Sequence, residues 1–223
     1  MEAENNGGVA PRKSNDRHRG TQIRLAVPLS NLDLIRAHRR VFEGTENNLF
    51  YLLMIAPSSL RDEYPASMPT KLEGMLTEKF EALARMDEHV SKHLTENNAE
   101  MGEAAGAEKV QMSVRTRLAK QYADLWVKCD ETLLKIDTAW LHGFVTDAKR
   151  GEYVASVIKQ VNKFWTQTSG EYRSIQRLLV ERRKRSGQTP ATDSTEVDEQ
   201  NPSEAQPVPD ITSDPVEQGL KAA

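Results

Sequence analysis

Side chains that could bind a metal ion or act in catalysis are few in this sequence. His89 and His93 are four residues apart, so a helix would place both imidazoles on one face, where they could bind a metal ion. The zinc-protease motif, however, needs a glutamate directly after the first histidine, and Val90 occupies that position. The carboxylates of Asp130 and Glu131 are adjacent and point apart on a helix. The sequence therefore predicts no enzyme, no metal site and no cofactor.

Other catalytic and export signals are also missing from the chain. The single cysteine, Cys129, excludes an intramolecular disulfide and a zinc site built from four thiolates. No glycine-rich phosphate loop follows a predicted strand. The first 20 residues are polar, and the longest apolar run, Leu49 to Ala56, is much shorter than the roughly 20 residues of a transmembrane helix. We expect a soluble, cytoplasmic protein that does not contact a membrane.

Charge is distributed unevenly along the 223 residues. From Ser186 onward the chain has eight acidic residues and one lysine, whereas residues 1–185 have a net charge of +4. Residues 186–223 have too few apolar side chains to fold and are predicted to form a disordered acidic tail. Residues 1–20 are predicted to form a disordered basic arm. A mildly basic folded part permits an anionic partner without requiring one.

The polar side chains with the most informative spacing lie near the N-terminus. From Thr21 to Val27 the sequence alternates with period two, which predicts a strand with two different faces. One face is polar and the other apolar: Gln22, Arg24 and Ala26 against Ile23, Leu25 and Val27. No second strand of comparable quality is evident elsewhere. The strand is therefore expected to pair, antiparallel, with the same strand of a second chain.

Such a ribbon could read DNA. A two-stranded ribbon fits the major groove of B-DNA, where arginine bonds to guanine, glutamine bonds to adenine, and an alanine methyl contacts the methyl of thymine. The polar face would then contact bases, and the apolar face would cover a core shared by the two chains.

The rest of the chain is predicted to be mainly helical. Ser30 or Asn31 would begin a first helix, Gly44 would end it, and Thr45 would begin a second helix that runs to Ala56. Longer amphipathic segments are predicted at about Thr70–Leu94, Arg115–Phe144 and Asp147–Arg185, with a flexible break at Thr95–Glu108. The predicted organisation is a motif at 21–56 followed by a helical dimerisation or effector region at 57–185.

The order strand, helix, glycine turn, helix over residues 21–56 resembles the ribbon-helix-helix (MetJ/Arc) family of DNA-binding proteins. The resemblance implies a homodimer in which Gln22, Arg24 and Ala26 contact bases. It also implies a phosphate contact from the amides of Thr45 and Glu46, although the Glu46 carboxylate departs from what a phosphate site favours. The expected phosphate contacts are Arg12, Lys13, Arg17, Arg19, Arg39, Arg40, Thr45 and Glu46. The expected dimer core is Ile23, Leu25, Val27, Leu34, Ile35, Leu49 and Leu52.

The full layout, with long helices after the motif, is similar to the AcaB-type transcriptional activators of conjugative plasmids and integrative elements. This resemblance implies a bacterial, nucleoid-associated activator of conjugative-transfer genes whose partners are promoter DNA, a second copy of the chain and RNA polymerase. Two other hypotheses stay open. The chain could be a DNA-binding antitoxin or plasmid-maintenance protein, or a helical scaffold or adaptor without nucleic acid.

Overall fold

The computed structural model describes residues 21–104 and 106–187. The predicted basic arm and the predicted acidic tail from residue 188 onward lie outside this part of the chain, and so do Arg12, Lys13, Arg17 and Arg19. The elements run in the order β1 (Ile23–Leu29), α1 (Leu32–Phe50), the π-helical η1 (Tyr51–Ile55), α2 (Ala56–Leu60), the 3-10 turn η2 (Arg61–Glu63), α3 (Met68–Glu96), β2 (Glu108–Val114), α4 (Arg117–Leu141) and α5 (Asp147–Arg185). The predicted mainly helical fold is confirmed.

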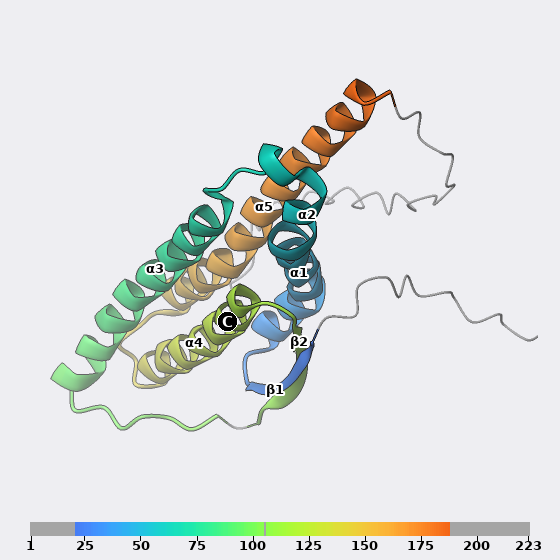
Figure 1. Ribbon diagram of the computed structural model, residues 1–223. Helices are drawn as coiled ribbons and strands as arrows, with labels where there is room; N and C mark the ends of the chain where they lie inside the picture. The colour runs from blue at the N-terminus through green and yellow to red at the C-terminus, as the bar shows by residue number, and fades with distance from the viewer. Residues whose placement is uncertain (1–20, 105, 188–223) are drawn as a thin grey trace, which may run out of the picture.

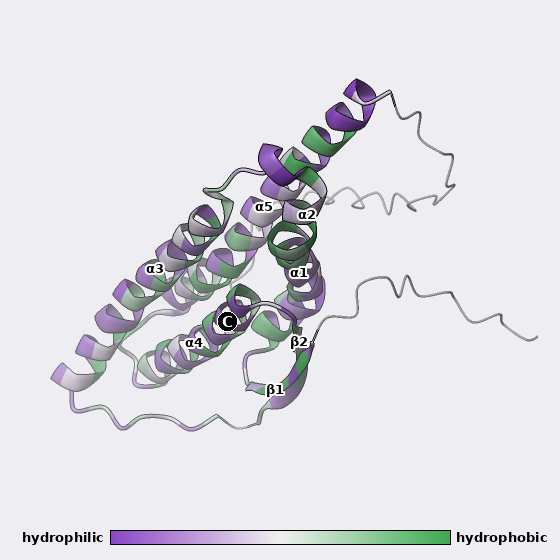
Figure 2. Cartoon of the chain, viewed as in Figure 1, coloured by the Kyte–Doolittle hydropathy of each residue, from purple (hydrophilic) through white to green (hydrophobic). Residues whose placement is uncertain are grey.

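Long helices form the body of the molecule, and the two strands lie along one side of it (Figure 1). Helices α3, α4 and α5 pack against one another, and α1 packs against α4 and α5. The strands contact α1 and α4. Each long helix alternates apolar and hydrophilic residues along its length, as an amphipathic helix must when one face is buried (Figure 2).

The partner of β1 comes from the same chain. Strands β1 and β2 pair antiparallel in a two-stranded sheet, with Ile23 opposite Val114 and Leu29 opposite Glu108. The expectation that the chain lacks a second strand is therefore wrong. The segment Lys109–Val114 alternates polar and apolar residues as regularly as β1 does, and it fills the hydrogen-bonding edge that was predicted to need a second chain. A ribbon-helix-helix pairing between two chains is not what this structure shows.

Helix α1 does not end at Gly44. It continues through Gly44 and Thr45 to Phe50, so the predicted turn between two helices is wrong. A Cβ at Gly44 would lie 3.5 Å from Nε1 of Trp165 on α5, an ordinary van der Waals distance, so the glycine is an exposed interior residue of α1 that faces α5. The interruption comes later, at the π-helical turn η1, just before Pro57. Proline lacks an N–H and clashes with the carbonyl four residues earlier, and a wider turn at this point relieves that clash.

The connection from β1 to α1 is fixed by side chains from two places. Asn31 is the N-cap of α1, as one of the two predicted possibilities, and its side chain accepts from the backbone N–H groups of Asp33 and Leu34. The carboxylate of Asp130 on α4 accepts hydrogen bonds from the N–H groups of Ser30 (3.0 Å) and Asn31 (3.1 Å). Because α4 thus binds the end of β1, the ribbon has a defined position on the helical body.

Aromatic side chains from three helices form the centre of the core. The ring of Tyr122 on α4 lies 5.6 Å from Phe42 on α1, 5.0 Å from Phe164 on α5 and 5.9 Å from Trp126, measured between ring centroids. Burial raises the pKa of Tyr122 well above its usual range. The apolar stripe predicted for α4 is buried here except for Trp140, which is 36% exposed.

No helix in residues 21–104 and 106–187 combines the length and the apolar composition needed to cross a bilayer.

Candidate nucleic-acid interface

The polar side chains of the ribbon are accessible, and part of their face borders a cleft shared with α1. Gln22, Arg24 and Ala26 are exposed, as the alternation predicts. Because β2 runs antiparallel to β1 in register, its own polar residues lie on the same face, with Ser113 opposite Arg24 and Gln111 opposite Ala26. We call this surface the outer ribbon face, and it consists of Gln22, Arg24, Ala26, Lys109, Gln111 and Ser113.

The outer ribbon face offers varied chemistry in a small area. It combines two cations, two amides, a hydroxyl and a methyl group. Neighbouring strands are about 4.8 Å apart, so a ribbon of two strands is narrower than the roughly 12 Å width of the DNA major groove. Base edges there present donors, acceptors and methyl groups, and each has a matching side chain on this face.

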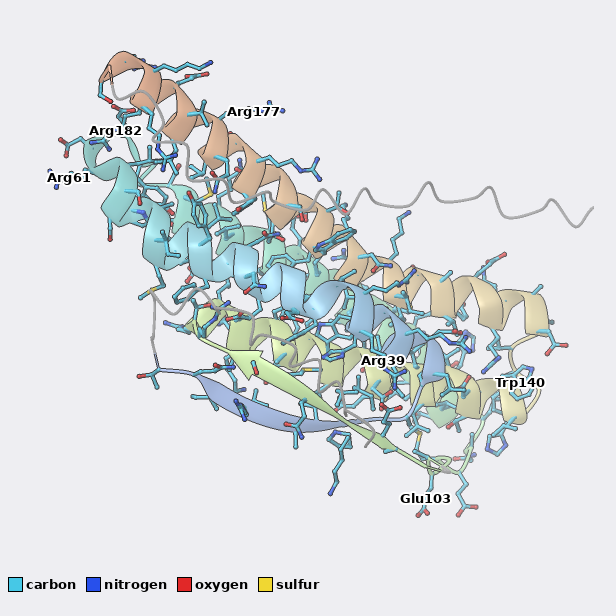
Figure 3. The ribbon with its side chains drawn as sticks, turned by 90° about the vertical axis from the view of Figure 1, so that its right-hand side faces the viewer. Arg39, Arg61, Glu103, Trp140, Arg177 and Arg182 are labelled. Carbon is cyan, nitrogen blue, oxygen red and sulfur yellow. The ribbon has the colours of Figure 1, made fainter. Side chains whose placement is uncertain are left out.

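Arginines of α1 flank the ribbon. Arg36, Arg39 and Arg40 are exposed on the side of α1 near β2, and Figure 3 shows Arg39 on the face of the molecule that also presents the ribbon. Arg36 bonds to Asp33 at 3.0 Å, and Arg39 bonds to Glu108 of β2 at 2.6 Å. These ion pairs partly neutralise the flank, and the pair between Arg39 and Glu108 joins α1 to the ribbon. Arg40 makes no ion pair with any described residue.

Thr45 and Glu46 lie inside the molecule, so the phosphate contact expected of their amides is not available. Both are interior residues of α1, where backbone N–H groups bond along the helix, and the Thr45 hydroxyl donates to the Val41 carbonyl at 2.8 Å. The side chain of Glu46 is 5% exposed and forms an ion pair with Arg115, which follows β2. One Glu46 oxygen also accepts from the Arg115 backbone N–H at 3.1 Å. Glu46 therefore holds the ribbon on α1.

A polar cleft of about 470 Å³ separates the ribbon from α1. Gln22, Gln111 and Arg115 line one side, and His38 and Phe42 lie on the α1 side. The His38 ring stacks on Phe42 at a centroid distance of 4.9 Å, and neither ring nitrogen has a hydrogen-bond partner among the described residues. Burial and, secondarily, the charge of Arg39 lower the pKa of His38, whereas Glu108 opposes the shift. Burial and the neighbouring Arg39 charge thus both favour the neutral imidazole.

The residues predicted as a dimer core are mostly buried within one chain. Val27, Leu34, Ile35, Leu49 and Leu52 belong to the single hydrophobic core of this chain. The reason is that β2 supplies the second strand and α4 and α5 cover α1, so these side chains need no second chain. Leu25 is half-buried, and Ile23 is 56% exposed at the open end of the ribbon, contrary to the expected burial of the whole apolar face.

Three of the six residues of the outer ribbon face are not among the contacts predicted from the sequence. Lys109, Gln111 and Ser113 are absent from the expected contacts, although they alternate with Val110, Met112 and Val114. That alternation is the signal that could have found them, and it follows a glycine- and alanine-rich stretch that hides the start of the strand.

The histidine pair and the single cysteine noted in the sequence both lie in the described part of the chain. His89 and His93 contact each other at a ring centroid distance of 4.8 Å, and no group of three possible metal ligands is gathered in residues 21–104 and 106–187. Burial raises the pKa of the Cys129 thiol well above its usual range, so the side chain is an inert part of the core.

Comparison with known proteins identifies a related fold. No protein-family model matches the chain, and no curated protein matches it. Among solved structures, the chain is similar to the crystal structure of selenomethionine-containing AcaB from uropathogenic E. coli, with a TM-score of 0.69 and 16% sequence identity. The likeness covers 76% of this chain and 88% of that chain. At this identity the likeness shows the fold, and the chain has an AcaB-like fold.

Proposed function

We propose that the protein is a sequence-specific DNA-binding transcriptional regulator that places the ribbon of β1 and β2 in the major groove. The observation that supports this most directly is the outer ribbon face, which sets out cationic, amide, hydroxyl and methyl groups on a support narrow enough for the groove. Arg40, with Arg39, would contact phosphates beside the groove, and the basic residues of the N-terminal arm would add sequence-independent attraction.

Because β1 and β2 of one chain form the ribbon, dimerisation would have a different role than in a ribbon shared by two chains. A ribbon formed by two chains requires a dimer before any base can be read. Here one chain already forms a complete ribbon, so one chain would read one half-site. A homodimer would read two half-sites and gain affinity from contacting both at once. We therefore propose that dimerisation increases the affinity for DNA and sets the distance between the two half-sites. It is not needed for one chain to contact the bases of one half-site.

The regulatory role rests on the AcaB-like fold together with the overall resemblance to activators of conjugative-transfer genes. We propose an activator that acts at promoters in the nucleoid, with helices α3 to α5 available to contact RNA polymerase. The ribbon and α3 are separate surfaces, since α3 has no extensive packing contact with either strand. A protein bound to DNA through the ribbon could therefore present α3 to a second partner.

The proposal is tested by selecting bound sequences from a randomised duplex library and then measuring affinities for the selected site. Arg24→Ala should weaken binding to that site by about 1–3 kcal/mol and relax selection at one base pair in each half-site. Arg85→Ala is the matched control, because Arg85 is an exposed arginine on α3, away from the ribbon. If the two variants select the same sequences with the same affinity, the ribbon does not read DNA. A chain that retains no duplex at low salt would favour a scaffold or adaptor.

A further inference from the structure

A second cationic surface lies at the C-terminal end of α5. This helix has 39 residues and extends past the other helices (Figure 1). Its last turns and the nearby turn between α2 and η2 together form what we call the basic end. The basic end consists of Arg61, Arg173, Arg177, Arg182, Arg183, Lys184 and Arg185. Figure 3 shows Arg61, Arg177 and Arg182 at the same end of the molecule, opposite to the end that holds Trp140.

Few acidic groups of α5 balance this charge, whereas Asp62 and Glu63 directly follow Arg61 in η2. Between Arg173 and Arg185 the only acidic residue is Glu181, which forms an ion pair with Arg185 at 3.6 Å. The guanidinium of Arg182 donates to the Ser59 carbonyl at 2.6 Å, which fixes the end of α5 to α2. Four further cations of α5 are exposed and have no ion pair within the described part of the chain: Arg173, Arg177, Arg183 and Lys184.

Stabilisation of the helix does not account for all of these charges. Cations in the last turn of a helix interact favourably with the partial negative charge at its C-terminus, and Arg182–Arg185 lie in that turn. The effect fades within one turn, however, and Arg173 and Arg177 lie two to three turns earlier. Their side chains gain little from the helix end, so the helix dipole does not explain them, and they are available to an external anion.

Arg61 is held at this end at a conformational cost. Its φ is 51°, in the left-handed region that favours glycine, and it follows directly on the end of α2. A glycine would satisfy this turn without strain. Retaining a long cationic side chain at such a position is consistent with a use for the charge.

We propose that the basic end binds the phosphate backbone of nucleic acid. Six of its seven members are arginines, whose planar guanidinium groups match phosphate oxygens in pairs. An anionic membrane fits less well, because surface-bound helices combine cations with a broad exposed apolar face. Here Val180 is exposed, but Leu178 and Leu179 pack against the core, and the tip of the helix is hydrophilic (Figure 2). This second contact is independent of base sequence, and it rests on the proposed function only for the identity of the polymer as DNA.

The test is the salt dependence of binding to a random-sequence duplex of about 40 base pairs by the full chain. Arg173→Gln combined with Arg177→Gln should lower the slope of log affinity against log salt concentration by about 1.8, or about 0.9 for each phosphate that is no longer neutralised. Consequently, the ratio of wild-type to variant affinity should be roughly tenfold larger at about 50 mM than at about 200 mM salt.

Lys159→Gln combined with Lys163→Gln is the matched control. These residues are exposed on the same helix at the same spacing of four, but they precede the basic end. An equal effect of both double variants, or no change in the arginine variant, would overturn the proposal. A loss restricted to one selected sequence would overturn it too, as would tighter binding to phosphatidylserine vesicles than to the duplex.

The experiment also separates this proposal from the proposed function. Arg24→Ala measured on the same duplexes reports on base reading alone. If Arg24→Ala changes nothing while the arginine double variant flattens the salt slope, the ribbon proposal fails and the basic end stands. If Arg24→Ala changes base selection while the arginine double variant leaves the salt slope unchanged, the proposal for the basic end fails and the proposal for the ribbon stands.

Arg61 provides a further check. Arg61→Gly should raise the melting temperature, because it relieves the strained turn, and should also weaken binding to the random duplex by about threefold at low salt. Arg61→Lys preserves the charge and should keep affinity within about twofold of wild type. A higher melting temperature with unchanged affinity would show that Arg61 does not belong to the surface.

Discussion

The outer ribbon face and the basic end of α5 are both cationic, but they are built differently. The ribbon face mixes side chains of several kinds on a two-stranded support, and the arginines Arg36 and Arg39 beside it are held in ion pairs. The basic end repeats one kind of side chain on one helix, and most of its charges are unpaired among the described residues. One surface has varied chemistry on a support held by ion pairs, while the other repeats one chemistry with few ion pairs among the described residues.

This difference suggests a division of labour between the two surfaces. Discrimination between bases depends on matched donors, acceptors and methyl groups at fixed positions, which a ribbon anchored on α1 and α4 can supply. Attraction to phosphates needs only charge, and it depends strongly on salt. The two surfaces can therefore be separated experimentally, because each should respond to a different perturbation.

The largest effect is expected from detaching the ribbon from α1. Glu46→Ala leaves the Arg115 guanidinium without its buried partner, which should lower the free energy of unfolding by about 3 kcal/mol in denaturant titrations. Selective binding should be lost, while salt-dependent binding to random duplex persists in the folded fraction. Glu43→Ala, an exposed change three residues earlier on α1, should cost less than about 0.5 kcal/mol. Equal stabilities of these two variants would contradict the anchoring role of Glu46.

The second prediction tests the contribution of β2 to reading. Gln111→Ala should reduce discrimination at one base pair by about 1–3 kcal/mol and leave the salt slope unchanged, as measured by competition between duplexes. Gln160→Ala on α5 is the control, since α5 does not pack extensively against the ribbon. A ribbon formed by β1 of two chains would make Gln111 irrelevant, so an unchanged preference would favour that arrangement.

The third prediction concerns α1, which packs against both the ribbon and α5, the helix that carries most of the basic end. Gly44→Ala should stabilise the protein by about 0.5–1 kcal/mol, because alanine favours a helix interior and its Cβ would be in ordinary contact with Trp165. Thermal unfolding measures the change, with Gly74→Ala on α3 as a control that should show a similar gain. A helix that ended at Gly44 would instead be destabilised by the substitution.

The smallest effect concerns pH. The pKa of His38 is lowered in the folded protein, so the unfolded chain binds more protons as the pH falls below about 6.5. The stability contributed by neutral His38 is fully present above that pH and is lost progressively as pH decreases. Stability measured from about pH 7.5 to about 5.5 should decline more in wild type than in His38→Phe. His38 does not belong to the basic end, so binding to random duplex should not follow the same curve.

The helices could be predicted from the sequence to a large extent. The predicted segments Thr70–Leu94, Arg115–Phe144 and Asp147–Arg185 match α3, α4 and α5 to within a few residues, and Asn31 caps α1 as one of the two predicted possibilities. The period of amphipathic helices and the chemistry of N-caps are local properties, which is why they can be predicted. Gly44 is misleading, because nothing local distinguishes a glycine at a helix end from a glycine placed against a distant tryptophan.

The candidate site could be predicted only in part. The exposure of Gln22, Arg24 and Ala26 follows from alternation along β1. The pairing of β1 with β2 does not follow, because register between segments far apart in the chain depends on how the intervening helices pack. The burial of Glu46 depends on the same packing, since its partner Arg115 lies on a distant segment of the sequence.

The separation of β1 from β2 along the chain also has a consequence for biosynthesis. About 80 residues lie between Leu29 and its partner Glu108, so β1 leaves the ribosome long before β2 exists. At translation rates of about 5–20 residues per second, the delay is roughly 4 to 16 seconds. During that time β1 has an open edge, the kind that recruits other strands and promotes aggregation. A nascent chain that stalls within α3 would therefore be prone to aggregate, and completion of β2 is the step that both covers the edge of β1 and completes the outer ribbon face.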